Sequence, residues 1–344
     1  MDRKWRALAA LSAAVCTFLC LAVPQIALYC PGAVTYVWLA GTPRPSPSPV
    51  SEPALGAESA PDPSPALTPA ADTPSPATLD PTPPAGGPEI RPFTDGGAAL
   101  RNFTDFSVDT DELAAAPLPQ RLGREGPQIL IIHTHGTEAY TSVPGEEYEP
   151  SDPYRTTDAS HSVIRVGDVL CRTLEEQGLR VVHDRELYDY PRYAGSYARS
   201  QAAVEAWLAL YPGIGIVIDL HRDAVGTDQV IYKTLSRIAL QSTAQVMMVI
   251  GTGENGLAHP HWRDNLALAL AMQRAAQADG DALPRPIRLV RERYNQHLSP
   301  GAFILEVGTN GNTLSEAERA AEQFGRAVGP LFLSLAEAEG DGEV

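Results

Sequence analysis

Cysteine is scarce in this chain of 344 residues, and its distribution is uneven. Three of the four cysteines lie within the first thirty residues, so the rest of the chain keeps only Cys171. Without a second thiol, that part can form neither an internal disulfide nor a cysteine-based zinc site. We therefore expect the folded part to depend on its apolar core, which a domain of about 200 residues can supply.

Positive charge is also scarce. Lys4 and Lys233 are the lysines of the chain, and 26 Lys and Arg residues stand against 42 Asp and Glu residues, for a net charge of −16. Proteins that bind nucleic acids need a basic surface that releases counterions from phosphate. The composition therefore predicts that nucleic acid is not a partner.

The N-terminus has the pattern of a membrane anchor. Arg3, Lys4 and Arg6 precede a run from residue 7 to residue 43 that contains no charged side chain. About 20 apolar residues suffice to cross a bilayer as a helix, and basic residues favour the cytoplasmic side. We expect residues 1–40 to form a short cytoplasmic N-terminus and a transmembrane anchor, with the rest of the chain outside the cytoplasm. The alternative is a cleaved signal peptide, whose apolar core is normally about 7–15 residues long.

Proline is concentrated in the segment after the anchor. Sixteen of the 31 prolines lie between Pro43 and Pro92, among Ala, Ser and Thr. Such a composition favours an extended chain that rises by about 3.1 Å per residue and cannot build a core. We therefore predict a disordered, Pro-rich linker at 41–97. The remaining chain divides into a lead-in arm, a domain and a short tail, at 98–126, 127–338 and 339–344.

The domain alternates between apolar runs and amphipathic segments. The pattern predicts strands at 128–133, 179–182, 214–221, 245–251, 287–290 and 302–307. It predicts helices at 162–177, 196–210, 263–278 and 314–333. This order indicates an α/β fold, a three-layer sandwich with a mostly parallel central sheet.

Three of the predicted strands end in a polar residue. His133, His221 and Glu306 each close an apolar run, and sites in open α/β sheets form beyond the carboxyl ends of strands. Two imidazoles and a carboxylate are suitable groups for a catalytic zinc site. The zinc ion lowers the pKa of a bound water molecule to about 7, and a nearby glutamate can take the proton from that water and pass it to the leaving nitrogen. This interpretation predicts amide hydrolysis. The alternative is that each histidine is an ordinary hydrogen-bonded residue at a strand end.

Four separate sequence runs carry a family resemblance. They read HTHGTEAY at 133–140, VIDLHRDA at 217–224, RYNQHLSPG at 293–301 and LEVGTNGNT at 305–313. Together they closely resemble stage II sporulation protein P over about residues 127–335. The resemblance implies a zinc-dependent peptidoglycan hydrolase of sporulation, with a fold similar to that of N-acetylmuramoyl-L-alanine amidases. It would cleave the amide between N-acetylmuramic acid and L-Ala during engulfment, and also peptide cross-links.

The resemblance also implies residue roles. His133 and His221 resemble the two zinc-binding histidines, and Glu306 resembles the catalytic glutamate. For the third ligand we expect Glu138, with His161 or Asp158 as alternatives. Arg222 is a candidate for binding a carboxylate or stabilising the oxyanion, and the candidates for substrate contacts are His135, Asn295 and Gln296.

The implied setting is a cell-membrane protein with a single span. Its catalytic domain would lie outside the cytoplasm, in the intermembrane space of the sporangium, with peptidoglycan and stage II sporulation proteins D and M as partners. Two other functions fit the same layout. One is a noncatalytic wall-binding or scaffold module on a membrane stalk, and the other is a metallopeptidase that acts only on stem peptides.

Overall fold

The structure is a computed structural model that describes residues 87–96, 99–236, 241–277 and 283–337. The chain divides into two units, Met1–Pro63 and Ser64–Val344, and everything that follows concerns the second. The predicted anchor, most of the predicted linker and the tail from residue 339 lie outside the described residues. Among the helices that the structure describes, none combines the length and the apolar character needed to cross a bilayer.

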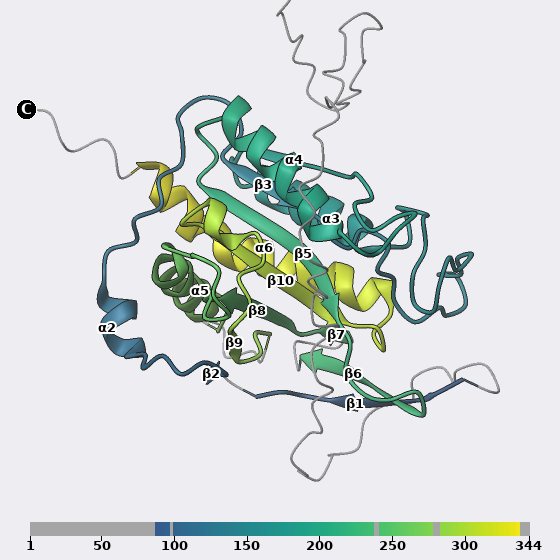
Figure 1. The fold of residues 1–344 in the computed structure, drawn as a ribbon. Helices are drawn as coiled ribbons and strands as arrows, with labels where there is room; N and C mark the ends of the chain where they lie inside the picture. Colours follow the sequence, from purple (N-terminus) through teal and green to yellow (C-terminus); the bar gives the residue numbers. More distant parts are fainter. Residues whose placement is uncertain (1–86, 97–98, 237–240, 278–282, 338–344) are drawn as a thin grey trace, which may run out of the picture. The chain divides into compact units, whose positions relative to one another are not determined.

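A seven-stranded sheet runs through the domain (Figure 1). In spatial order its strands are β2 (Leu100–Asn102), β9 (Ile287–Val290), β8 (Val246–Gly251), β10 (Ala302–Thr309), β5 (Ile216–Asp223), β3 (Ile129–Ile132) and β4 (Val181–His183). Five of the six strand pairs are parallel, which agrees with the sequence-based expectation. The exception is the antiparallel pair of β8 and β10. As a result β10, β5, β3 and β4 all end at the same edge of the sheet.

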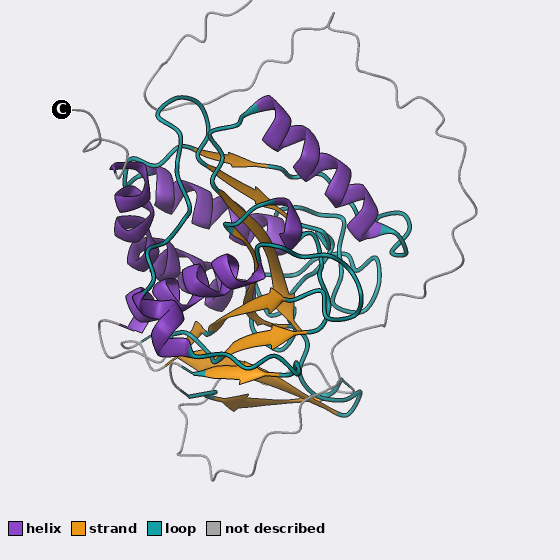
Figure 2. Ribbon diagram, turned by 60° about the vertical axis from the view of Figure 1, so that its left-hand side comes forward, coloured by secondary structure: helices purple, strands orange, loops and turns teal. Residues whose placement is uncertain are grey.

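Helices cover both faces of this sheet. On one face α3 (Val163–Glu175), α5 (Trp262–Gln277) and α6 (Leu314–Glu337) pack over the main hydrophobic core. On the other face α4 (Ser196–Leu210) covers a smaller cluster built on β3 and β5. Figure 2 shows this arrangement, with one long helix on the side opposite the others. The layers are those of the predicted sandwich.

The sequence of α3 explains both its start and its buried face. The Ser162 hydroxyl accepts a hydrogen bond from the Ile164 amide, which satisfies one of the free amides at the helix start. Val163, Val166 and Leu170 then recur at helical spacing and are completely buried. This face packs against α6 and the sheet.

A second, three-stranded sheet was not predicted from the sequence. Its order is β1 (Glu89–Phe93), β6 (Val230–Ser236) and β7 (Thr243–Ala244), with β1 parallel to β6. Strand β1 lies inside the segment that we expected to be a disordered linker, so that expectation is corrected for residues 89–93. The strand forms because Phe93 packs edge-on against Tyr232, with ring centroids 5.8 Å apart.

The lead-in arm packs against the domain, as expected. It contributes β2 at the edge of the main sheet and α2 (Thr110–Ala115), whose N-terminus is capped by Asp109. Leu113 and Leu118 pack against the main core.

A chain of ion pairs centred on the buried Arg285 joins the segment before β2 to β5. The guanidinium of Arg285 donates to Asp223 at 2.7 Å and to Asp95 at 3.4 Å. Arg101 binds both carboxylate oxygens of Asp95, at 2.7 and 2.9 Å. These ion pairs therefore connect the segment before β2 to the C-terminal end of the central strand β5.

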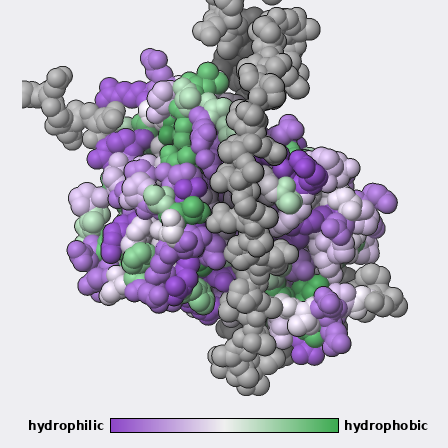
Figure 3. All heavy atoms as spheres, viewed as in Figure 1, coloured by the Kyte–Doolittle hydropathy of each residue, from purple (hydrophilic) through white to green (hydrophobic). Residues whose placement is uncertain are grey.

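Large hydrophobic side chains are exposed at scattered positions of the described surface. They are Phe103, Phe106, Tyr190, Tyr193, Leu210 and Leu257. In the view of Figure 3, hydrophilic residues cover most of the described surface, with smaller hydrophobic areas between them.

Candidate active site

Strands β5 and β10 place His221 and Glu306 side by side. The two residues are direct partners in the parallel register, and neighbouring strands lie about 4.8 Å apart. Both side chains lie on the sheet face opposite the main core, because Leu220 and Leu305 next to them belong to that core. Glu306 is partly exposed while the other residues of β10 are buried. Glu306 is thus the one residue of β10 that is not fully buried.

The environment of Glu306 favours its protonated form. Burial and the nearby charge of Asp223 raise its pKa to about 8, against an opposing effect of His221. Its Oε2 atom is buried and accepts no hydrogen bond. A carboxyl group with this pKa can both release and take up a proton near neutral pH.

The turn that follows β3 brings Glu138 to the same place. Its Oε2 atom lies 3.4 Å from Nδ1 of His221 and accepts a hydrogen bond from the Arg222 amide. Burial alone would raise the pKa of Glu138, but the Arg222 charge and the contact with His221 outweigh it and hold the pKa well below the usual value. Glu138 is therefore an ionised carboxylate buried beside an imidazole.

His135 lies in the same turn and also reaches His221. The two rings meet edge to face, with centroids 5.2 Å apart. Burial and the nearby His221 lower the pKa of His135 to about 3, so its imidazole is neutral at physiological pH. Its Nδ1 atom is buried without a hydrogen bond.

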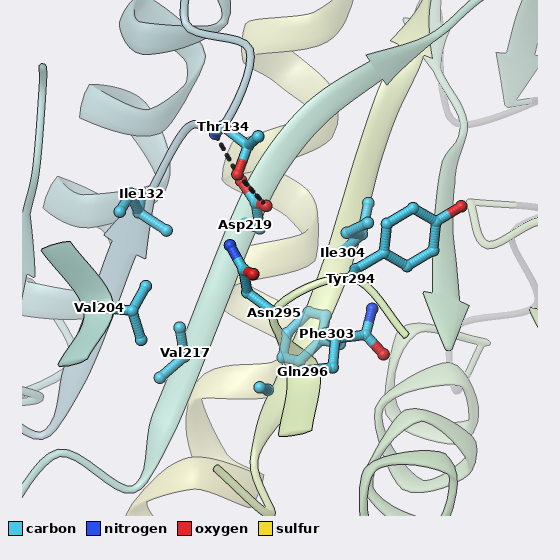
Figure 4. A pocket seen from close by; sticks show the side chains of 11 residues that line it. Ile132, Thr134, Val204, Val217, Asp219, Tyr294, Asn295, Gln296, Phe303 and Ile304 are labelled. Carbon is cyan, nitrogen blue, oxygen red and sulfur yellow. Dashed lines mark hydrogen bonds between the residues drawn. The ribbon is translucent and has the colours of Figure 1, made fainter. Parts of the chain in front are cut away.

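Asp219 supports His221 from two positions earlier on β5. Its Oδ1 atom lies 2.9 Å from Nε2 of His221, and it accepts hydrogen bonds from the amide and hydroxyl of Thr134. Burial would lower the pKa of His221, but Asp219 and Glu138 raise it well above its usual value. Figure 4 shows Asp219 and Thr134 facing each other across β5 and the end of β3.

His133 does not join this group. Its Nδ1 atom lies 2.8 Å from the carbonyl oxygen of Leu220, and its Nε2 atom lies 2.7 Å from Nε2 of His183. His183 in turn contacts Asp168 of α3 at 3.1 Å. A Cβ atom at Gly167 of α3 would lie 2.7 Å from both Nε2 atoms, so this helix position needs glycine. His133 therefore lies under α3, on the opposite face of the sheet from His221.

Two other predicted site residues bond to the main chain. The guanidinium of Arg222 donates to the carbonyl oxygens of Ala139 and Tyr154, at 2.8 and 3.0 Å. The buried side-chain amide of Gln296 pairs with the main chain of β8, at Gly251 and Val249. Both polar groups therefore have main-chain partners, and Gln296 also lines the small pocket described next.

Asn295 lies closer to the site. Its amide donates to Ser200 and to the carbonyl oxygen of Tyr197, both on α4. It lines a small pocket that also includes Thr134 and Asp219 (Figure 4). The pocket continues from the histidine site along the same sheet face.

Asp158 and His161, the alternatives for the third ligand, bind each other instead. Nδ1 of His161 lies 2.8 Å from Asp158, whose side chain is half exposed. Ser160 completes this turn through hydrogen bonds to both side chains.

The match to known families covers most of the domain just described. Residues 98–329 match the profile of the family named Stage II sporulation protein P (SpoIIP). The chain belongs to the stage II sporulation protein P family. Stage II sporulation protein P of Bacillus subtilis (strain 168) is 27% identical over 235 residues, which cover 65% of this chain and 55% of that relative. The chain thus matches little more than half the length of this curated family member.

Solved structures with some similarity are N-acetylmuramoyl-L-alanine amidases. AmiC2 of Nostoc punctiforme is 13% identical with a TM-score of 0.34, covering 61% of this chain and 97% of that one. The apo form of Ami1 from Mycobacterium abscessus is 12% identical with a TM-score of 0.36, covering 61% and 99%. The catalytic domain of CwlV from Bacillus (Paenibacillus) polymyxa var. colistinus is 12% identical with a TM-score of 0.34, covering 60% and 99%.

The donor atoms at this site fit a zinc ion in their chemistry. Two donors about 2.1 Å from a tetrahedral zinc lie about 3.4 Å apart, and Glu138 Oε2 and His221 Nδ1 are 3.4 Å apart. The buried Nδ1 of His135, which makes no hydrogen bond, is a third suitable donor. Among the described residues, however, no group of three or more His, Cys, Asp or Glu side chains is arranged so that it could hold a metal ion.

The sequence reasoning missed two residues beside the site, Arg155 and Tyr193, and it also missed His183, which contacts His133 on the opposite face of the sheet. His183 binds His133, Arg155 lies 3.5 Å from Glu138, and Tyr193 stacks on His135. None belongs to the four runs that resemble the family. Only the histidine that closes β4 had a signal in the sequence, because it too ends a strand at this edge of the sheet.

Proposed function

We propose that this domain is a zinc-dependent peptidoglycan hydrolase. Its substrate would be the amide between N-acetylmuramic acid and L-Ala, with peptide cross-links as a second target. The observation that carries the proposal is the pairing of Glu306 with His221 at the carboxyl ends of neighbouring strands, beside the ionised Glu138. Membership of the stage II sporulation protein P family supports the cell-wall substrate.

In this proposal His135, Glu138 and His221 would hold the zinc ion. His135 replaces His133 of the sequence-based ligand set because His133 points under α3 toward His183. His221 must lose one proton to become a ligand, as ligand imidazoles are neutral. Asp219 at its other nitrogen would orient the ring. When bound, zinc would polarise the scissile carbonyl and acidify a water molecule.

Glu306 would move the proton in the reaction. Its carboxylate accepts a proton from the attacking water, the new C–O bond forms, and the protonated Glu306 delivers that proton to the amide nitrogen as the C–N bond breaks. The products are a carboxylic acid and a free amine. A pKa of about 8 would allow Glu306 to accept a proton in the first step and to release it in the second.

Arg222 has a supporting role in this proposal. Its guanidinium is held by main-chain oxygens and its charge keeps Glu138 ionised. Asn295 remains a candidate for substrate contacts because it lines the neighbouring pocket. We further propose that the domain acts outside the cytoplasm, tethered by the N-terminal segment, together with stage II sporulation proteins D and M.

The test is digestion of purified peptidoglycan by the full-length chain in detergent, followed by mass spectrometry of the soluble products. The reaction is run with zinc, with a chelator, and with zinc added back after the chelator. Release of intact stem peptides in the zinc reactions alone supports the amidase.

Two other outcomes would support the alternative functions. Cleaved peptides on a glycan that keeps its stem peptides would indicate a metallopeptidase limited to the stem. If the wild-type chain releases no product even with zinc and both partner proteins present, the domain is a noncatalytic wall-binding module.

A further inference from the structure

Tyr193 contacts His135 in two ways, through its ring and through its hydroxyl group. The two rings stack at an angle of 15°, with centroids 4.5 Å apart. The Tyr193 hydroxyl lies 3.1 Å from Nε2 of His135. His135 is buried, whereas Tyr193 is 47% exposed. Tyr193 thus lies between His135 and the solvent.

Hydrogen bonds connect the loop that carries Tyr193 to the turn that carries His135. The carboxylate of Asp189 in this loop accepts hydrogen bonds from the hydroxyl and amide of Thr137. Arg155 bridges the same two residues, at 2.8 Å from Asp189 and 3.0 Å from Thr137. Its guanidinium carbon also lies over the Tyr193 ring, 4.9 Å from the centroid. These contacts restrict where the Tyr193 ring can lie.

The two nitrogens of His135 have different surroundings. Nε2 contacts the Tyr193 hydroxyl, while Nδ1 is buried and has no hydrogen-bond partner. A neutral imidazole has one N–H group and one lone pair. If Nε2 carries the hydrogen and donates it to Tyr193, the lone pair is on Nδ1, where a metal can bind. In the opposite tautomer a buried N–H group at Nδ1 would lack an acceptor, which is unfavourable.

We propose that Tyr193 is a positioning residue that holds His135 as the Nε2–H tautomer, with Nδ1 free to bind zinc. The assignment rests on the proposed ligand set of His135, Glu138 and His221. Hydrogen-bond partners of this kind fix the orientation of a ligand histidine, and their loss typically weakens metal binding 10- to 100-fold.

The first test compares zinc affinity between two variants of the same loop. Tyr193→Phe removes the hydroxyl and keeps the stacked ring. Tyr190→Phe is the matched control, because Tyr190 lies in the same loop and is 52% exposed. Competition with a chromophoric chelator on the full-length chain should give a zinc Kd that is 10- to 100-fold higher for Tyr193→Phe. Tyr190→Phe should match the wild type, and both variants should keep the wild-type melting temperature.

The second test reads the tautomer directly in the zinc-free chain. Nitrogen-15 NMR of histidine-labelled protein should show the hydrogen of His135 on Nε2, with the resonance assigned by its absence in His135→Gln. A hydrogen on Nδ1, or a wild-type zinc Kd for Tyr193→Phe, would overturn the role of Tyr193 and leave the proposed hydrolase intact. A wild-type chain that binds no zinc would instead overturn both proposals.

Discussion

The Nε2 atoms of His133 and His183 lie 2.7 Å apart beneath α3, on the sheet face opposite His221. This contact takes the histidine that ends β3 out of the candidate active site. It also explains the glycine at position 167, which leaves room for both rings against the helix. The pair therefore stabilises the junction of β3, β4 and α3, and His135 takes the place in the site that the sequence suggested for His133.

Substitution of the histidines should separate these two roles. We expect His135→Gln and His221→Gln to lose bound zinc, measured by elemental mass spectrometry after dialysis. His133→Gln should keep its zinc but lose about 1–3 kcal/mol of unfolding free energy in urea, because a buried hydrogen bond is broken. The partly exposed His261 provides the control variant His261→Gln. Loss of zinc from His133→Gln, with retention by His135→Gln, would restore the ligand set suggested by the sequence.

Glu306→Gln should abolish proton transfer while the fold remains. The amide is close in size to the carboxyl group, but it cannot accept a proton from water. We expect the rate of product release from peptidoglycan to fall by about 10²- to 10⁴-fold at an unchanged melting temperature. Glu205→Gln on the exposed side of α4 is the matched control and should retain full activity. Activity of Glu306→Gln within a few fold of the wild type would remove Glu306 from the reaction.

Arg285→Met should strongly destabilise the domain. Arg285 is 2% exposed and pairs with the buried carboxylates of Asp95 and Asp223. Its removal leaves the buried Asp223 without its ion-pair partner, while Asp95 keeps its contact with Arg101, and an unpaired buried charge costs about 3–5 kcal/mol. Urea unfolding measures this loss. The control Arg291→Met removes an exposed side chain that pairs with Asp105 and Glu254, and it should reduce the unfolding free energy much less than Arg285→Met does.

His259 should make the domain less stable in mild acid. Burial, with smaller effects from His297 and His261, lowers its pKa from 6.5 to about 4 in the folded state. Below pH 6.5 the unfolded chain takes up a proton that the folded chain does not, so the unfolding free energy decreases as the pH falls toward 4. The full effect is about 3 kcal/mol.

Unfolding in urea at a series of pH values measures the contribution of His259. The variant His259→Gln cannot titrate at this position, so its stability should depend less on pH between 6.5 and 4 than that of the wild type. His261→Gln serves as the comparison: it removes only one of the smaller effects on the pKa of His259 and should keep most of the wild-type pH dependence. Identical pH curves for wild type and His259→Gln would contradict the prediction.

Much of the architecture follows from local patterns in the sequence. The continuous apolar runs of β3, β5 and β10 identify buried strands, and the spacing in α3 identifies an amphipathic helix, because periodicity depends only on neighbouring residues. The polar residues that end these strands lie at one edge of the sheet, because the strands are parallel. Strand β1 was missed because its pairing with β6 and the contact of Phe93 with Tyr232 join segments far apart in the chain.

The composition of the site depended on strand register, which the sequence does not contain. His133 and His221 both follow apolar strands, and either could face either side of the sheet. In the structure Ile132 pairs with Asp219, so His133 shares the face of Leu220 and lies away from His221. A shift of one residue would reverse this, since side chains alternate between faces. The sequence alone therefore determined which strands end in polar residues, and the tertiary structure decided which of those side chains meet.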